Sequence, residues 1–250
     1  MLGAAGFLGI ESVAPSLLGT TQLGPAQLAA GTLIACGAAM IPDIDHPQAT
    51  LARSLPPVSN AISRTVNMLA GGHRKGTHTI WCWALITALA YWGLQLSVGP
   101  IVALIVASFC ALLFLRVLTE SDGLVCLLLA CVLGGAAVLA AGPDMAWIEH
   151  AIFIGFGLHL LGDIVTTEGI PMFYPFWGNQ RIPVLGDTDH FRERTAGTLC
   201  GFVAFYLLVT VVFLPGWSAQ QAQAQSQKRA QHATTVSQKP SLLHQLINEF

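Results

Sequence analysis

The sequence predicts an all-α membrane protein, a bundle of about six transmembrane helices. Of its 250 residues 54% are hydrophobic and only 10% are charged, a composition typical of integral membrane proteins. A helix needs roughly 20 apolar residues to cross a bilayer. The apolar runs are continuous rather than alternating, which favours helices over a barrel. Near-chargeless stretches of about this length fall at 24–41, 79–97, 100–118, 124–142, 147–165 and 196–215.

The regions outside these stretches are an N-terminal apolar segment, short turns and a polar tail. The apolar stretch 1–18, with Glu11 as its one charge, is too short to span with certainty and is interpreted as part of a further helix. Turn-forming residues at 97–100 and 142–144 separate neighbouring spans. We therefore expect one membrane domain over 1–217. The tail 218–250 is polar, rich in Gln and Ala, and is expected to be disordered.

Composition also excludes several classes of site. The six cysteines lie in or beside apolar runs without a Cys-x-x-Cys pair, so they are interpreted as packing residues rather than as disulfides or zinc thiolates. A formal net charge of −2 and the lack of a dense basic patch give no indication of nucleic-acid binding.

The distribution of basic residues predicts the orientation. With six spans, the loops at 42–78, 119–123 and 166–195 lie on one side of the membrane. Cytoplasmic loops carry an excess of Lys and Arg, so this side is expected to face the cytoplasm of a cell whose inner (plasma) membrane holds the protein. The basic residues on this side are Arg53, Arg64, Arg74, Lys75, Arg116, Arg181, Arg192 and Arg194, against Lys228, Arg229 and Lys239 in the tail.

Three clusters of metal-type side chains occur at the ends of the spans on that side. The first is Asp43, Asp45 and His46, which lie between two prolines directly after a span. Two carboxylates and an imidazole within four residues suit a divalent cation. The alternative is a solvated turn that ends the helix.

The second cluster contains His73 and His78, just before the span that starts at 79. Thr77 is expected to cap that helix. Arg74 and Lys75 beside the histidines could bind an anionic group such as phosphate. The alternatives are ordinary surface histidines and charges that only set the topology.

The third cluster is His159 and Asp163, four residues apart and therefore on one face of a helix. Polar groups inside a span are functional candidates because burying them in lipid is costly. His150 lies on the opposite side of this helix and Glu149 at its other end, so both are excluded from the site. Loop residues that could support the site or act as a general base, or could simply be solvated, are Glu168, Asp187, Asp189 and His190.

These motifs resemble those of the YdjM-like family of bacterial inner-membrane metal-dependent hydrolases, over about residues 24–195. The matching elements are 42–47, the His73-x-x-Gly76-Thr77-His78 motif, and His159-x-x-x-Asp163 followed by 166–171 and 174–176. The resemblance implies a multi-helix membrane protein with a metal site, distantly similar to zinc phospholipase C and P1-type nucleases. Family members usually begin with a Thr/Ser-His element, which does not precede Leu2 here, so either the start lies downstream of it or one ligand is absent.

The combined expectation is a hydrolase that uses one or two divalent ions, preferably zinc, to activate water against a phosphoester at the cytoplasmic face. Its partners would be membrane lipid and a small-molecule or lipid phosphoester. The alternatives are an ion- or proton-coupled transporter and a non-catalytic protein stabilised by metal. The candidate ligands are Asp43, Asp45, His46, His73, His78, His159 and Asp163.

Overall fold

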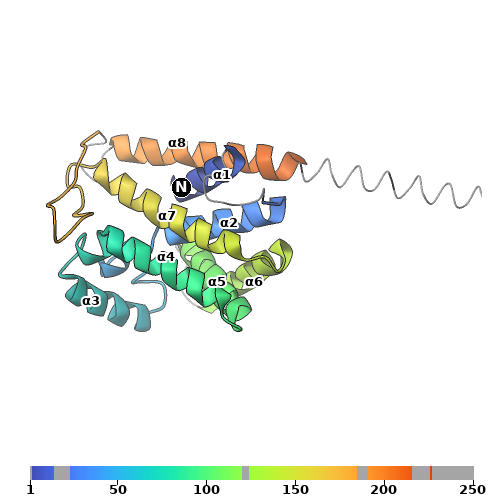
Figure 1. Ribbon diagram of the computed structural model, residues 1–250, viewed down its shortest axis with the longest axis horizontal. Helices are drawn as coiled ribbons and strands as arrows, with labels where there is room; N and C mark the ends of the chain where they lie inside the picture. The colour runs from blue at the N-terminus through green and yellow to red at the C-terminus, as the bar shows by residue number, and fades with distance from the viewer. Residues whose placement is uncertain (1, 14–22, 120–123, 185–190, 216–225, 227–250) are drawn as a thin grey trace, which may run out of the picture.

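The protein is built from helices and their connecting segments in the part of the chain that the computed structural model describes, which is residues 2–13, 23–119, 124–184, 191–215 and 226. Those residues contain no β-strand, and one isolated bridge joins Ile170 to Gln180. Figure 1 shows helices that run roughly along one long axis. They are α1 (Leu2–Val13), α2 (Pro25–Ala38), α3 (Val58–Ala70), α4 (Ile80–Gln95), α5 (Gly99–Thr119), α6 (Leu124–Ala141), α7 (Ala146–Ile164) and α8 (Phe191–Leu207), with short helical turns η2 (Pro42–Asp45), η3 (Gly76–His78) and η4 (Leu208–Phe213).

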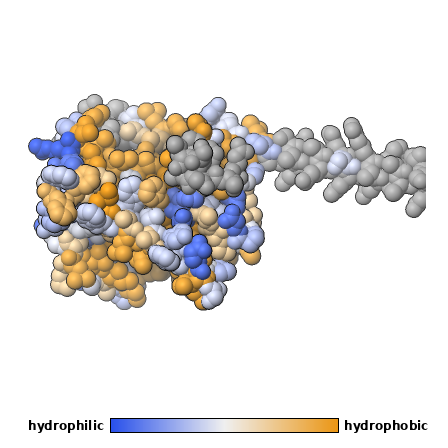
Figure 2. Space-filling view, in the orientation of Figure 1, coloured by the Kyte–Doolittle hydropathy of each residue, from blue (hydrophilic) through white to orange (hydrophobic). Residues whose placement is uncertain are grey.

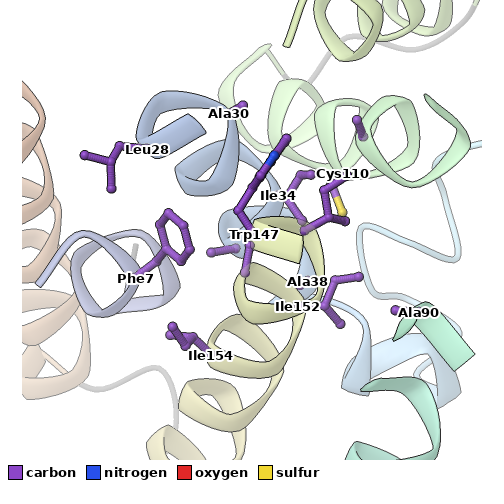
Figure 3. Packing of buried hydrophobic residues seen from close by; sticks show 14 of the residues in the cluster. Phe7, Leu28, Ala30, Ile34, Ala38, Ala90, Cys110, Trp147, Ile152 and Ile154 are labelled. Atoms are coloured by element: carbon purple, nitrogen blue, oxygen red, sulfur yellow. The ribbon is translucent and has the colours of Figure 1, made fainter. Parts of the chain in front are cut away.

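The core lies where α2 and α7 pack against each other and against α1 and α5. Phe7, Ile34 and Trp147 are almost completely buried there, and Figure 3 shows them converging from three helices. Trp147 also donates its indole N–H to the Asp144 carbonyl at 2.7 Å, which satisfies its one polar atom. The most buried helix of the bundle, α7, is thus the one that carries His159 and Asp163.

Glycines allow α2 to approach its neighbours closely. A Cβ added at Gly155 of α7 would lie 2.4 Å from the Ala35 carbonyl oxygen of α2, and one added at Gly3 of α1 would lie 2.6 Å from the same atom. Backbone oxygens cannot move aside as a flexible side chain can. Small residues at helix contacts are typical of membrane bundles, where close packing replaces the hydrophobic effect.

The outer helices expose apolar side chains instead of burying them. Leu85 and Trp92 of α4, Leu128 of α6 and Phe202 of α8 are all more than half exposed. Hydrophobic residues predominate on the face seen in Figure 2. An apolar surface of this extent is typical of protein that faces lipid.

Four helical segments in the described residues are long and apolar enough to cross a membrane: Pro25–Asp45, Gly99–Thr119, Leu124–Ala141 and Thr195–Phe213. They correspond to four of the six stretches expected from the sequence. The other two stretches form α4, which has only 16 residues, and α7, which is a continuous helix but carries polar side chains near both ends. The prediction of an all-α membrane protein is therefore confirmed, whereas a count of six spans is not established by these helices.

Two local expectations are corrected. The segment 42–78, expected to be a loop, contains the amphipathic helix α3, because its apolar residues recur with helical spacing among polar ones. The cap of α4 is Thr79 rather than Thr77: the Thr79 hydroxyl accepts a hydrogen bond from the Cys82 amide at 3.3 Å. The expected tail lies outside the described residues, apart from residue 226.

The metal-type residues gather at one end of the bundle. There α3, the start of α4 and the end of α7 lie close to η2, η3 and the segment 165–184 (left in Figure 1). The opposite end holds the turn between α6 and α7 and the start of α7, which carries Glu149 and His150.

Candidate metal centre

The short helix η2 directs its two aspartates differently. Successive residues of a 3₁₀-helix are turned by about 120°, so positions two apart point to different sides. The side chain of Asp45 is completely buried, whereas that of Asp43 is 37% exposed. The sequence places these carboxylates together, but the turn gives them separate environments.

Asp45 is held by three other segments of the chain. Its two carboxylate oxygens are hydrogen-bonded to His73 Nδ1 at 2.8 Å and to the Thr77 hydroxyl at 2.6 Å. Asn67 of α3 donates to its backbone carbonyl at 2.6 Å. Both carboxylate oxygens of Asp45 therefore have protein partners, and Asp45 orients His73 and Thr77.

Thr77 links Asp45 to His78 through hydrogen bonds to both side chains. Thr77 donates its single hydroxyl hydrogen to Asp45, so Thr77 Oγ1 can only accept a hydrogen bond from His78 Nδ1, 2.9 Å away. That contact fixes the Nδ1–H form of the ring in the neutral state and leaves the lone pair on Nε2. Metal-binding histidines are commonly oriented in this way by a hydrogen bond at the other ring nitrogen.

Three ligand atoms meet at the centre of the cluster. His78 Nε2 and His159 Nε2 each lie 3.3 Å from Asp163 Oδ2. All three atoms are buried, and none has a hydrogen-bond partner of acceptable geometry among the described residues. Unsatisfied buried polar atoms cost about 1–3 kcal/mol each, so a proton shared within the cluster or a bound cation would stabilise it.

A metal ion fits this arrangement. Ligands bound tetrahedrally to zinc at 2.0–2.1 Å are about 3.3 Å apart, close to the two separations measured here. The ligand atoms of His78, His159 and Asp163 lie within 4.8 Å of one another. Three protein ligands with an open position are typical of catalytic zinc sites.

Asp43 lies at the edge of this group. Its Oδ1 is 3.5 Å from His78 Nε2 and 3.7 Å from His159 Nε2. Asp43 also forms a second possible metal group with His73 and His78. Its partly exposed carboxylate can therefore serve either as a further ligand or as a proton acceptor beside an ion.

Arg74 positions Asp163. Its guanidinium contacts Asp163 Oδ1 at 3.2 Å and Glu168 Oε2 at 2.7 Å, which leaves Asp163 Oδ2 for the centre. Arg74 has a φ of 57°, an uncommon value for a residue other than glycine. Strained backbone of this kind is frequent at functional sites. Lys75 beside it is exposed.

The remaining predicted residues lie farther out or elsewhere. His46 packs its ring 4.5 Å from that of His73, and its Nδ1 accepts from the Gln48 amide. Glu149 and His150 pair loosely at 3.8 Å in the first turn of α7, at the opposite end from Asp163. Asp187, Asp189 and His190 lie outside the described residues.

Two supporting residues were not anticipated. Asn67 lies in a segment that had been interpreted as a loop, and the helical spacing of the apolar residues in 58–70 was the signal that could have placed it. Thr77 had been assigned to capping. Its position directly before His78 gave no indication of the link to Asp45, which depends on how the chain folds back.

These features define an all-α membrane protein with a His and Asp cluster suited to a divalent ion. Residues 2–219 match the YdjM inner membrane protein family, and the chain belongs to this family. No curated protein and no solved structure gives a significant match.

Replacing Thr77 by Val should weaken metal binding about 10- to 100-fold, because the substitution removes the hydroxyl that orients His78. Thr77→Ser keeps the hydroxyl and should bind metal like the parent protein. The measurement is zinc affinity by competition with a chromogenic chelator, with folding monitored by gel filtration. Equal affinity in both variants would contradict the proposed role of Thr77.

Metal binding should release about one proton at pH 7. Burial lowers the pKa of His78, but the Asp163 and Asp43 carboxylates beside it outweigh this effect and raise the pKa to about 9. His78 is therefore protonated below that pH, and an ion must displace its proton. Zinc affinity should rise about tenfold per pH unit between pH 6 and 8.

Calorimetry in buffers of different ionisation enthalpy measures this release directly. His46→Ala, which alters a neighbouring imidazole, should release the same number of protons. Binding without proton release at pH 7 would show that His78 is already neutral.

Proposed function

We propose that the protein is a metal-dependent hydrolase that cleaves a phosphoester at the cytoplasmic face of the membrane. The observation that carries this proposal is the buried group of His78, His159 and Asp163, whose three ligand atoms have no hydrogen-bond partner in the described residues. An accessible carboxylate, Asp43, lies beside them. This combination suits a catalytic metal site, which keeps an open coordination position, better than a structural site, in which protein ligands normally fill every position.

Zinc is the ion that best suits the donors, two imidazole nitrogens and a carboxylate oxygen. We favour one ion, because both carboxylate oxygens of Asp45 are already bound within the protein. The second group, Asp43, His73 and His78, shares His78 with the first and offers the alternative of two ions.

When bound, such an ion supplies a Lewis acid that lowers the pKa of water. Asp43 Oδ1 is placed to take a proton from the attacking water. In the net reaction the water oxygen bonds to phosphorus, the bond from phosphorus to the ester oxygen breaks, and the proton passes through Asp43 to the departing alcohol. Arg74 and Lys75 would attract the anionic substrate.

The position of the cluster favours hydrolysis over transport. Transporter sites typically lie near the bilayer midplane on interrupted helices. Here the candidate ligands lie at the end of α7 and in the turns η2 and η3, which precede and follow helices at one end of the bundle. A substrate could reach them from the cytoplasm or from the lipid headgroups.

We also infer that α4 and α7 cross the membrane with the four longer segments, giving six crossings. The 19 residues of α7 extend about 28 Å at 1.5 Å per residue, close to the thickness of the hydrocarbon core. The excess of Lys and Arg on the side of the candidate site supports a cytoplasmic location for that side.

Asp163→Asn should abolish both metal binding and hydrolysis, because the amide keeps the size of the side chain but removes its charge. The assay is metal content together with hydrolysis of phosphoester substrates by the purified protein. His150→Asn, on the same helix but at its other end, should leave both unchanged. Full metal content and turnover in Asp163→Asn would rule out hydrolysis at this centre.

The orientation is tested with single cysteines in a background without native cysteines. Gln48 and Ser97 are both exposed, at opposite ends of the bundle. In intact cells an impermeant thiol reagent should label Ser97→Cys but not Gln48→Cys. The reverse pattern would place the candidate site outside the cytoplasm.

A further inference from the structure

An apolar cavity of about 760 Å³ opens beside the candidate metal centre. Asp43, His159 and Asp163 form part of its wall. The rest is largely hydrophobic and comes from α1, α2, α5, α7 and α8. Residues that represent these apolar walls are Leu2, Phe114, Leu118, Leu158, Leu161 and Ala196.

The cavity reaches the outer surface of the bundle. Val117 and Leu118 of α5 and Leu161 of α7 line it and are each more than half exposed. In a membrane this surface faces lipid, so an aliphatic chain could enter sideways from the bilayer. A fully polar substrate would have no apolar group to bury against this wall.

A second cavity, of about 480 Å³, has a different character. His73, Arg74, Lys75 and Glu168 line it. Arg74 is hydrogen-bonded to Asp163, which lines the apolar cavity. The metal-type residues therefore lie between an apolar compartment and a compartment that carries two cations.

Helix α3 indicates that this end of the protein is in contact with lipid. Its buried residues Ser59 and Ser63 are polar, while Val58, Ile62 and Leu69 on the adjacent face are exposed. An exposed apolar face is unusual for an amphipathic helix of a soluble protein, which buries that face. Such a face is typical of helices that insert their apolar side among lipid headgroups and acyl chains.

We propose that the substrate is an amphiphile, a phosphoester with a long aliphatic chain, and this inference rests on the proposed hydrolase function. The chain occupies the apolar cavity, and the phosphate lies at the metal-type residues within reach of Arg74 and Lys75. The bond to be cleaved then lies at the junction of the two cavities. Each methylene buried from water contributes roughly fourfold to affinity, so chain length is the property that distinguishes this substrate class.

The experiment measures binding of two non-hydrolysable probes, dodecylphosphonate and ethylphosphonate, to the zinc-loaded full chain in lipid nanodiscs. Empty nanodiscs supply the correction for partitioning into lipid. We expect dodecylphosphonate to bind at least 100-fold more tightly. Equal affinities for the two probes would overturn the proposal.

Gly197 of α8 allows the cavity to be filled without disturbing the fold. It lines the cavity, and a Cβ added there would meet nothing within 4 Å. Gly197→Leu should weaken binding of dodecylphosphonate about tenfold while leaving ethylphosphonate affinity and zinc content unchanged. The matched control is Gly9→Leu, because Gly9 also lies in a helix with open space around it but is not part of the cavity wall.

The two proposals can fail separately. If Gly197→Leu weakens the binding of both probes equally, or of neither, the alkyl chain of the substrate does not occupy this cavity and the amphiphile proposal is overturned. Metal-dependent hydrolysis of a short-chain phosphoester would then leave the hydrolase intact with a soluble substrate. Hydrolysis and metal content that persist in full in Asp163→Asn would instead overturn the proposal that the hydrolase acts at this centre.

Discussion

The buried carboxylate of Asp45 is the interaction on which the candidate centre depends. This carboxylate lies in η2, beyond the end of α2, has no contact with solvent, and is hydrogen-bonded to His73 and Thr77, while Asn67 donates to the Asp45 backbone carbonyl. A buried charge is tolerated only when it is fully hydrogen-bonded. The segment from α3 to η3 folds around the metal-type residues, and in doing so it supplies all of these hydrogen bonds to Asp45.

The bundle supplies the rigidity that this arrangement needs. Gly3 and Gly155 allow α1 and α7 to approach the same carbonyl of α2, so the helix that precedes Asp43 and the helix that carries His159 are in direct contact. Groups placed on packed helices hold their positions better than groups on loops. The orientation of His78, by contrast, depends on side-chain hydrogen bonds.

Much of this could be predicted from the sequence. Long apolar runs indicated a helical membrane protein, and the topology predicted that three distant motifs would lie at the same end. The i, i+4 spacing placed His159 and Asp163 on one face, where both contact the centre. The different environments of Asp43 and Asp45 were not predictable, because they depend on a 3₁₀ turn that spacing alone does not reveal. The contact from Thr77 to Asp45 depends on a fold-back of the chain that has no local sequence signature.

The structural position of the three central ligands has a consequence for the stability of the molecule. Asp43 and Asp163 bring negative charges close together, and the histidines that separate them come from turns and helices far apart in the sequence. A bound cation would act as a crosslink between the ends of α2, α4 and α7. Removal of that cation would return a proton to His78, which can pair with the carboxylates but holds them less firmly than a metal ion, so this end of the bundle would loosen while the glycine-packed helices at its centre stay together.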